Sequence, residues 1–192
     1  MNPKTVIKGK IHYVGVNDRN KHLFEGMWPL PYGVSYNSYL IDDETVALVD
    51  TVDICYFEVY LRKIKSIIGE RPIQYLIINH MEPDHCASLA ELVLRYPEIK
   101  IVCNAKTLGI IRQFYRFDAD SRALIVKEGD TLSTGKHTLT FVMAPMVHWP
   151  EVMVTYDTTD KTLFSADAFG TFGALNGNLF ADEVNFETEW LD

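Results

Sequence analysis

The stretch Ile77-Ile78-Asn79-His80-Met81-Glu82-Pro83-Asp84-His85 decides how this sequence folds and where its chemistry lies. Its first residues end a predicted buried strand, and four side chains of metal-ligating type follow in the order H-x-E-x-D-H. His80 and Glu82 are two apart in extended chain, so they project to the same side. We expect a helix to open at Asp84, which is a good N-cap residue. One loop can therefore supply ligands to two adjacent metal ions.

Strand-like and helix-like segments alternate on both sides of this stretch. The helical pattern is clearest over Ile54–Ile68, a second helix runs from Asp84 until Pro97 ends it, and a third covers Ala105–Tyr115. Polar breaks at Asp42-Asp43 and Thr158-Thr159-Asp160 predict hairpin turns within antiparallel meanders. Strands are predicted at Lys10–Val16, Tyr36–Ile41, Thr45–Asp50, Gln74–Asn79, Lys100–Cys103, Ala123–Lys127, Thr138–Ala144, Val152–Tyr156 and Thr162–Ser165.

These elements predict an α/β (α+β) domain in which sheet packs on sheet and helices lie outside. The 192 residues show no repeat, low-complexity tract or Gly/Ser-rich linker, so we expect residues 1–192 to form one domain. The acidic segment Ala181–Asp192 is predicted to begin a further helix.

Charge and cysteine content exclude several classes of function. The sequence has 18 Lys and Arg against 26 Asp and Glu, a net charge of −8, which argues against nucleic acid and against an anionic membrane surface as partners. Its apolar runs are too short to span a membrane, and no secretory signal is visible. The three cysteines lack metal-binding spacing, which favours a reducing, cytoplasmic location.

Two later residues extend the candidate metal cluster. His148 and Asp167 each follow a predicted strand, and loop positions at strand ends are where ligands gather on a rigid scaffold. Either residue alone is as well explained by a turn as by metal binding.

With these residues in view, the sequence resembles the diiron domain of the flavodiiron proteins, a branch of the metallo-β-lactamase fold. The resemblance rests on the H-x-E-x-D-H motif with the spacing to His148 and Asp167, and it covers nearly the whole chain. It implies a metallo-β-lactamase-like αββα sandwich, incomplete at the C-terminus. Further similar segments are Tyr36–Ile41, Asp50-Thr51-Val52, His148-Trp149-Pro150 and Asp167-Ala168-Phe169-Gly170.

The resemblance also implies a ligand set for two non-haem iron ions. His80, Glu82 and His148 would hold the first iron, Asp84 and His85 the second, and Asp167 would bridge them. A further histidine and an FMN-binding flavodoxin-like domain would lie beyond Asp192, so we expect the sequence to be part of a longer protein. Alternatively, water or a partner's side chain completes the second iron.

The function implied is reduction of dioxygen to water, of nitric oxide to nitrous oxide, or of both, by an oxidoreductase that requires an electron donor. The donor would be flavodoxin-like or rubredoxin-like, with FMN supplied by a missing domain or a partner, in a homodimer. Glu82 stands where related hydrolases have histidine, and its anionic oxygen favours iron redox chemistry over zinc hydrolysis. Two alternatives stay open, namely a diiron oxygen-binding sensor or signalling protein without its own FMN, and a dinuclear metal-dependent hydrolase.

Overall fold

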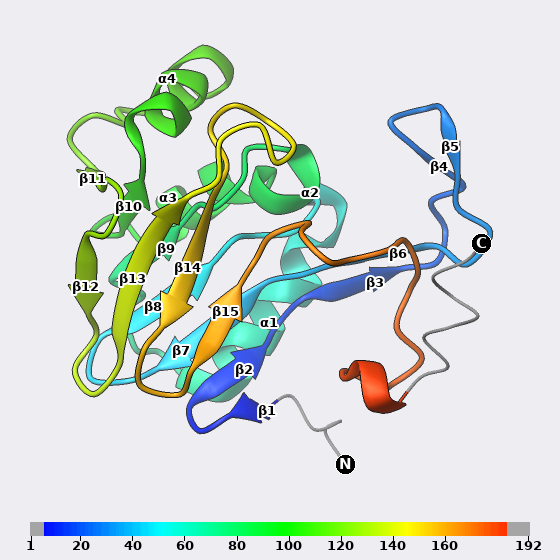
Figure 1. Cartoon of the computed structure of the whole chain (residues 1–192), viewed down its shortest axis with the longest axis horizontal. Helices are drawn as coiled ribbons and strands as arrows, with labels where there is room; N and C mark the ends of the chain where they lie inside the picture. Colours follow the sequence, from blue (N-terminus) through cyan, green and yellow to red (C-terminus); the bar gives the residue numbers. More distant parts are fainter. Residues whose placement is uncertain (1–5, 184–192) are drawn as a thin grey trace.

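Two β-sheets pack face to face in the computed structural model, which describes residues 6–183 (Figure 1). The larger sheet contains, in spatial order, β1 (Val6–Lys8), β2 (Ile11–Tyr13), β7 (Tyr39–Asp42), β8 (Val46–Val49), β9 (Tyr75–Ile77), β10 (Lys100–Cys103) and β11 (Ala123–Ile125). The smaller contains β12 (Thr131–Ser133), β13 (Thr138–Met143), β14 (Met153–Asp157) and β15 (Thr162–Phe164). Two short hairpin-like pairs stand apart, β3 (Val16–Asp18) with β6 (Val34–Tyr36), and β4 (Leu23–Phe24) with β5 (Trp28–Pro29).

Apolar side chains fill the spaces on either side of the larger sheet. Between the sheets, Val49 and Ile77 meet Phe141 and Phe164 in one core cluster. On its other face the larger sheet packs against the helices, which are α1 (Phe57–Ile68), α2 (Pro83–Cys86), α3 (Leu89–Arg95) and α4 (Ala105–Phe114). Residues 6–183 therefore form three layers, which are the helices, the larger sheet and the smaller sheet (Figure 1). These are three of the four layers expected for an αββα sandwich.

Helix α1 shows how the sequence dictates this packing. Phe57, Leu61, Ile64 and Ile68 recur three or four residues apart and are buried against the sheet. Burial of each such side chain stabilises the fold by about 1.5–3 kcal/mol relative to its exposed state. The short 3-10 helix η1 (Ile54–Tyr56) precedes α1, and Gly69 follows it with φ 63°, a backbone conformation that residues with a Cβ rarely adopt.

The predicted mixed fold and both hairpin turns are confirmed, but the larger sheet is only partly an antiparallel meander. Strands β8, β9, β10 and β11 pair in parallel, because helices connect successive strands and return the chain to the same end of the sheet. The predicted strands Lys10–Val16 and Tyr36–Ile41 were too long, since each is divided between two strands.

The second helix also differs from the prediction. It is broken into α2 and α3, and Glu82 rather than Asp84 is the N-cap residue. Asp84 lies inside the first turn, which directs its side chain to the candidate site.

Of the segment Ala181–Asp192, only Ala181–Glu183 lies in the described part, as the 3-10 helix η2; the rest of the predicted helix falls outside it. None of the described helices combines the length and apolar content needed to cross a membrane.

Asn79 joins the two sheets immediately before His80. Its side-chain amide donates to the carbonyl of Phe164 at 3.2 Å and accepts from Thr155 Oγ1 at 2.7 Å, while its backbone N–H donates to Asp50 Oδ1 at 2.7 Å. The residue is fully buried. These bonds fix the ends of β8, β9, β14 and β15 relative to one another, at the end of the sandwich where the candidate ligands lie.

Replacing Asn79 by alanine should lower the free energy of unfolding by about 1–3 kcal/mol, because Thr155 and Phe164 would lose their buried partners. Urea denaturation of the metal-free protein measures this change. The control is Gln113→Ala, an exposed change on α4 that should stay within about 0.5 kcal/mol of wild type. Equal midpoints for the two variants would contradict the role of Asn79.

Candidate metal centre

The six predicted ligands come from loops and from the short helix α2 at one end of the sandwich. His80 and Glu82 follow β9, Asp84 and His85 lie in α2, His148 lies between β13 and β14, and Asp167 follows β15. His80, Glu82 and His85 are buried, whereas 56% of the His148 side chain and 39% of the Asp167 side chain are exposed. The structure brings all six side chains together.

Four of them surround one point. His80 Nε2 lies 3.2 Å from Glu82 Oε2 and 3.3 Å from Asp167 Oδ2. His148 Nε2 lies 3.1 Å and 3.3 Å from the same two oxygens. Ligands about 2.0–2.2 Å from a transition metal are separated by about 2.8–3.6 Å, depending on the coordination geometry. The four atoms thus have the spacing of ligands around one ion.

The other two side chains form a second group around the opposite oxygen of Asp167. His85 Nε2 lies 2.7 Å from Asp167 Oδ1 and 3.6 Å from Asp84 Oδ2. Asp84 Oδ1 is buried and has no hydrogen-bond partner within the described residues. Asp167 therefore divides its two carboxylate oxygens between the two groups, as a bridging ligand does. An unpartnered buried carboxylate oxygen is costly unless a cation satisfies it.

Two further carboxylates, which were not predicted as site residues, stand behind the buried histidines. Glu151 Oε1 is hydrogen-bonded to His80 Nδ1 at 2.9 Å, an arrangement common for metal-ligating histidines. Asp50 Oδ2 lies 3.4 Å from His85 Nδ1, which has no hydrogen-bond partner in the described part of the chain. Asp50 directly follows β8, so its place at a strand end was a signal available in the sequence, whereas Glu151 lies in the loop between β13 and β14 and offered no such signal.

The electrostatics of the metal-free site match a centre that exchanges protons for metal. Burial opposes protonation of His80, but hydrogen bonds to Glu151 and Glu82 outweigh burial and raise the pKa of His80 to about 9. Burial also opposes protonation of His85, yet bonding to Asp167 and Asp50 raises its pKa well above the usual value. Burial, helped by the nearby charges of Glu82 and Asp167, raises the pKa of Asp84. Protons therefore occupy the space where a cation would offset these carboxylates.

A cleft of about 540 Å³ opens onto the centre. Glu82, Asp84, His85, His148 and Asp167 line its floor. Its walls come from the β4–β5 hairpin, from β6 and the residues after it, and from the loop around Asp167. They mix polar side chains such as Ser35 and Asn37 with the aromatic rings of Phe24, Trp28 and Phe172. The rings of Phe24 and Phe172 pack with centroids 5.0 Å apart, which joins the hairpin to that loop.

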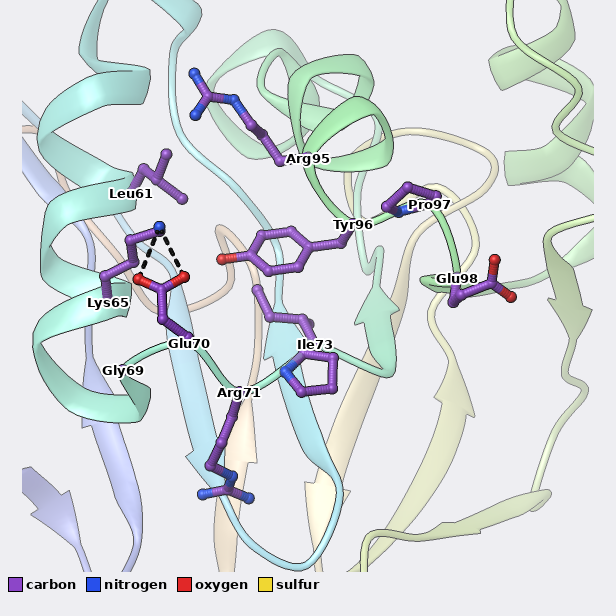
Figure 2. Close-up of a pocket in the computed structure, with 11 residues that line it drawn as sticks. Leu61, Lys65, Gly69, Glu70, Arg71, Ile73, Arg95, Tyr96, Pro97 and Glu98 are labelled. Carbon is purple, nitrogen blue, oxygen red and sulfur yellow. Dashed lines mark hydrogen bonds and ion pairs between the residues drawn. The ribbon is translucent and has the colours of Figure 1, made fainter.

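A smaller cavity of about 290 Å³ lies away from the centre, between the end of α1 and the segment Arg95–Glu98 (Figure 2). Its Lys65 is paired with Glu70 at 3.2 Å, and Arg71 and Arg95 have acidic partners outside it. The cavity has no link to the six ligands.

A third set of metal-ligating residues, His137, Asp157 and Asp160, lies at the opposite end of β13 and β14. Asp157 accepts backbone N–H groups from Thr159 and Asp160 and pairs with His137 Nδ1 at 2.8 Å. The hairpin turn accounts for this arrangement.

Comparison with known proteins agrees with this geometry. Residues 34–191 match the family described as "ODP family beta lactamase". The chain belongs to this ODP family. It is 40% identical over 189 residues to the anaerobic nitric oxide reductase flavorubredoxin of Salmonella arizonae. The aligned region covers 97% of this chain and 39% of the flavorubredoxin.

Solved flavodiiron structures share the ODP fold with this chain. The rubredoxin oxygen:oxidoreductase of the anaerobe Desulfovibrio gigas superimposes with a TM-score of 0.89 at 36% identity, covering 96% of this chain and 45% of that one. The flavodiiron protein of Giardia intestinalis gives a TM-score of 0.89 at 33% identity, covering 96% and 44%. The predicted resemblance to flavodiiron proteins is confirmed, and this chain spans less than half the length of these relatives.

Metal binding by this ODP protein should release protons at neutral pH. His80, with a pKa of about 9, is protonated at pH 7 and must lose its proton to offer Nε2 to a metal. The apparent affinity should therefore fall as the pH decreases from 8 to 6, by up to about tenfold per pH unit for each proton released. Anaerobic titration with ferrous iron against a competing chelator, corrected for chelator protonation, measures it. An affinity independent of pH would contradict the assignment.

Proposed function

We propose that this chain is the diiron core of an oxidoreductase that reduces dioxygen to water, nitric oxide to nitrous oxide, or both. The observation that carries the proposal is the Asp167 carboxylate, whose two oxygens face two separate groups of donors. His80, Glu82 and His148 would hold one iron, Asp84 and His85 the other, with Asp167 between them. The names of the similar flavorubredoxin and rubredoxin oxygen:oxidoreductase support extending these activities to this chain.

The donor set fits iron. Three carboxylates, from Glu82, Asp84 and Asp167, offset most of the charge on two divalent ions, and anionic oxygen together with imidazole suits an ion that cycles between ferrous and ferric states. When bound, the two irons would supply two electrons and open coordination positions for the substrate. Asp84 Oδ2, 3.6 Å from His85 Nε2, is the Asp84 oxygen that faces the second group.

The cleft above the ligands suits a small substrate of low polarity. Phe24, Trp28 and Phe172 contribute apolar surface to it. Dioxygen and nitric oxide have little polarity and need no hydrogen-bonding partners to enter such a cleft. Asp167 and His148 are the ligands most exposed to the cleft.

Electrons would come from FMN on a flavodoxin-like domain or partner, in a homodimer that brings the flavin to this cleft. Exposed apolar side chains support such docking. Trp28 and Phe172 line the cleft, and Met27, Tyr32 and Phe169 are exposed in the adjoining chain segments. The proposed location is the cytoplasm, where the three cysteines, all free, would stay reduced.

The proposal predicts two iron ions per wild-type chain and turnover of oxygen or nitric oxide when a reduced flavodoxin or rubredoxin is supplied. Asp167→Ala should lose most of its iron and at least about 100-fold in turnover, since both ions share that carboxylate. Iron analysis and an oxygen or nitric oxide electrode measure these effects, with Asp160→Ala at the distant turn as control.

Three results would contradict the proposal or one of its parts. An iron-loaded protein that binds oxygen reversibly without turnover under full electron supply would be a sensor. Two zinc ions with phosphodiesterase or thioesterase activity would make it a hydrolase. Unchanged iron in Asp167→Ala would remove the bridging assignment.

A further inference from the structure

The three histidines of the centre differ in what holds the ring nitrogen that faces away from it. His80 Nδ1 lies 2.9 Å from Glu151 Oε1, a hydrogen-bonding distance. His85 Nδ1 lies 3.4 Å from Asp50 Oδ2 but has no hydrogen-bond partner in the described part of the chain, and Asp50 accepts the backbone N–H of Asn79 through its other oxygen. No carboxylate pairs with His148 Nδ1 among residues 6–183.

Glu151 is built into the protein at some cost. Its side chain is fully buried, and Oε2 has no hydrogen-bond partner in the described part of the chain. Oε1 accepts both the His80 ring nitrogen and the backbone N–H of Met81, the latter at 3.0 Å. The backbone of Glu151 is fixed in turn, because Asn104 Nδ2 donates to its carbonyl at 2.6 Å. A buried carboxylate that is only half satisfied destabilises a fold, so its presence here points to a role other than stability.

The geometry also determines how His80 is protonated in the loaded centre. The Glu151 oxygen acts as an acceptor towards Met81, so the shared hydrogen bond requires His80 to carry its proton on Nδ1. Nε2 is then the free donor atom, and it points at Glu82 and Asp167. A carboxylate behind an imidazole makes the opposite nitrogen a better electron donor and fixes the plane of the ring.

We propose that Glu151 is a positioning residue for the iron held by His80, Glu82, His148 and Asp167. It fixes the tautomer and orientation of His80, strengthens binding of this iron, and stabilises its ferric state. The second iron, supported by the longer Asp50 contact, is the weaker of the two and the easier to keep ferrous. This inference rests on the proposed function only in requiring that the centre holds iron.

The test compares wild type, Glu151→Gln and Asp157→Asn, each full chain made metal-free and reloaded anaerobically with ferrous iron. Glutamine keeps the shape, and its Oε1 can accept the same two N–H groups. The variant therefore removes the charge and places an NH2 group where the unpartnered Oε2 stands. Asp157→Asn is the matched control, because Asp157 is also fully buried and bonded to a histidine, His137, at 2.8 Å, but at the far end of the sandwich.

Glu151→Gln should bind one of its two irons about 10- to 100-fold more weakly in chelator competition, while the other iron is unchanged. When the diferrous protein is oxidised stepwise, the mixed-valent signal in electron paramagnetic resonance should appear at a higher potential than in wild type, because the ferric state of the first iron has lost the support of the Glu151 charge. Asp157→Asn should lose stability in urea but keep wild-type affinity and potential. If Glu151→Gln fails to fold, Glu151→Asp replaces it, because it keeps the charge but is too short to reach His80. It should show the same weaker binding of one iron and the same rise in potential.

A folded Glu151 variant with wild-type affinity for both irons and wild-type potential would overturn the inference, and Glu151 would then serve only to anchor Met81. That outcome differs from failure of the proposed function, in which wild type itself would not take up two irons. Turnover is not needed to decide between them.

Discussion

Three carboxylates and three imidazoles converge at one end of the sandwich, and the rest of the site depends on how their charges are balanced. Asp167 faces one group of donors with each oxygen, so neither group can be moved without the other. Without metal, protons on His80 and His85 hold the carboxylates together, as their raised pKa values indicate. Burying these ionisable groups is favourable only when their charges are offset, and two divalent cations would supply the positive charge that the three carboxylates require.

The fold meets this requirement by ending several strands at the same place. β8 ends just before Asp50, β9 just before His80, and β15 just before Asp167. The Asn79 amide joins the two sheets beside these strand ends. Rigid strand ends set the ligand spacing more finely than a mobile loop would. The two buried histidines differ in what stands behind them, a 2.9 Å hydrogen bond with Glu151 for His80 and a 3.4 Å approach of Asp50 for His85.

Much of this was predictable from the sequence, for identifiable reasons. The H-x-E-x-D-H stretch is local, and the apolar periodicity around it is strong, so the mixed fold, the hairpins and the convergence of six side chains could be predicted. The break between α2 and α3 could not, because Ser88 bonds to the distant carbonyl of Val52. Glu151 was missed for a similar reason, since its contacts with His80 and Met81 join residues far apart in sequence, and a lone acid after a proline carries no local signal.

The central claim is that this chain holds two irons joined by Asp167. Anomalous X-ray diffraction at the iron edge, on crystals of anaerobically loaded protein, tests it most directly. We expect two peaks about 3.5–4 Å apart, one on each side of the Asp167 carboxylate, with His80 and His148 at the first and His85 at the second. A single peak, or iron elsewhere in the molecule with these six side chains left unligated, would contradict the account.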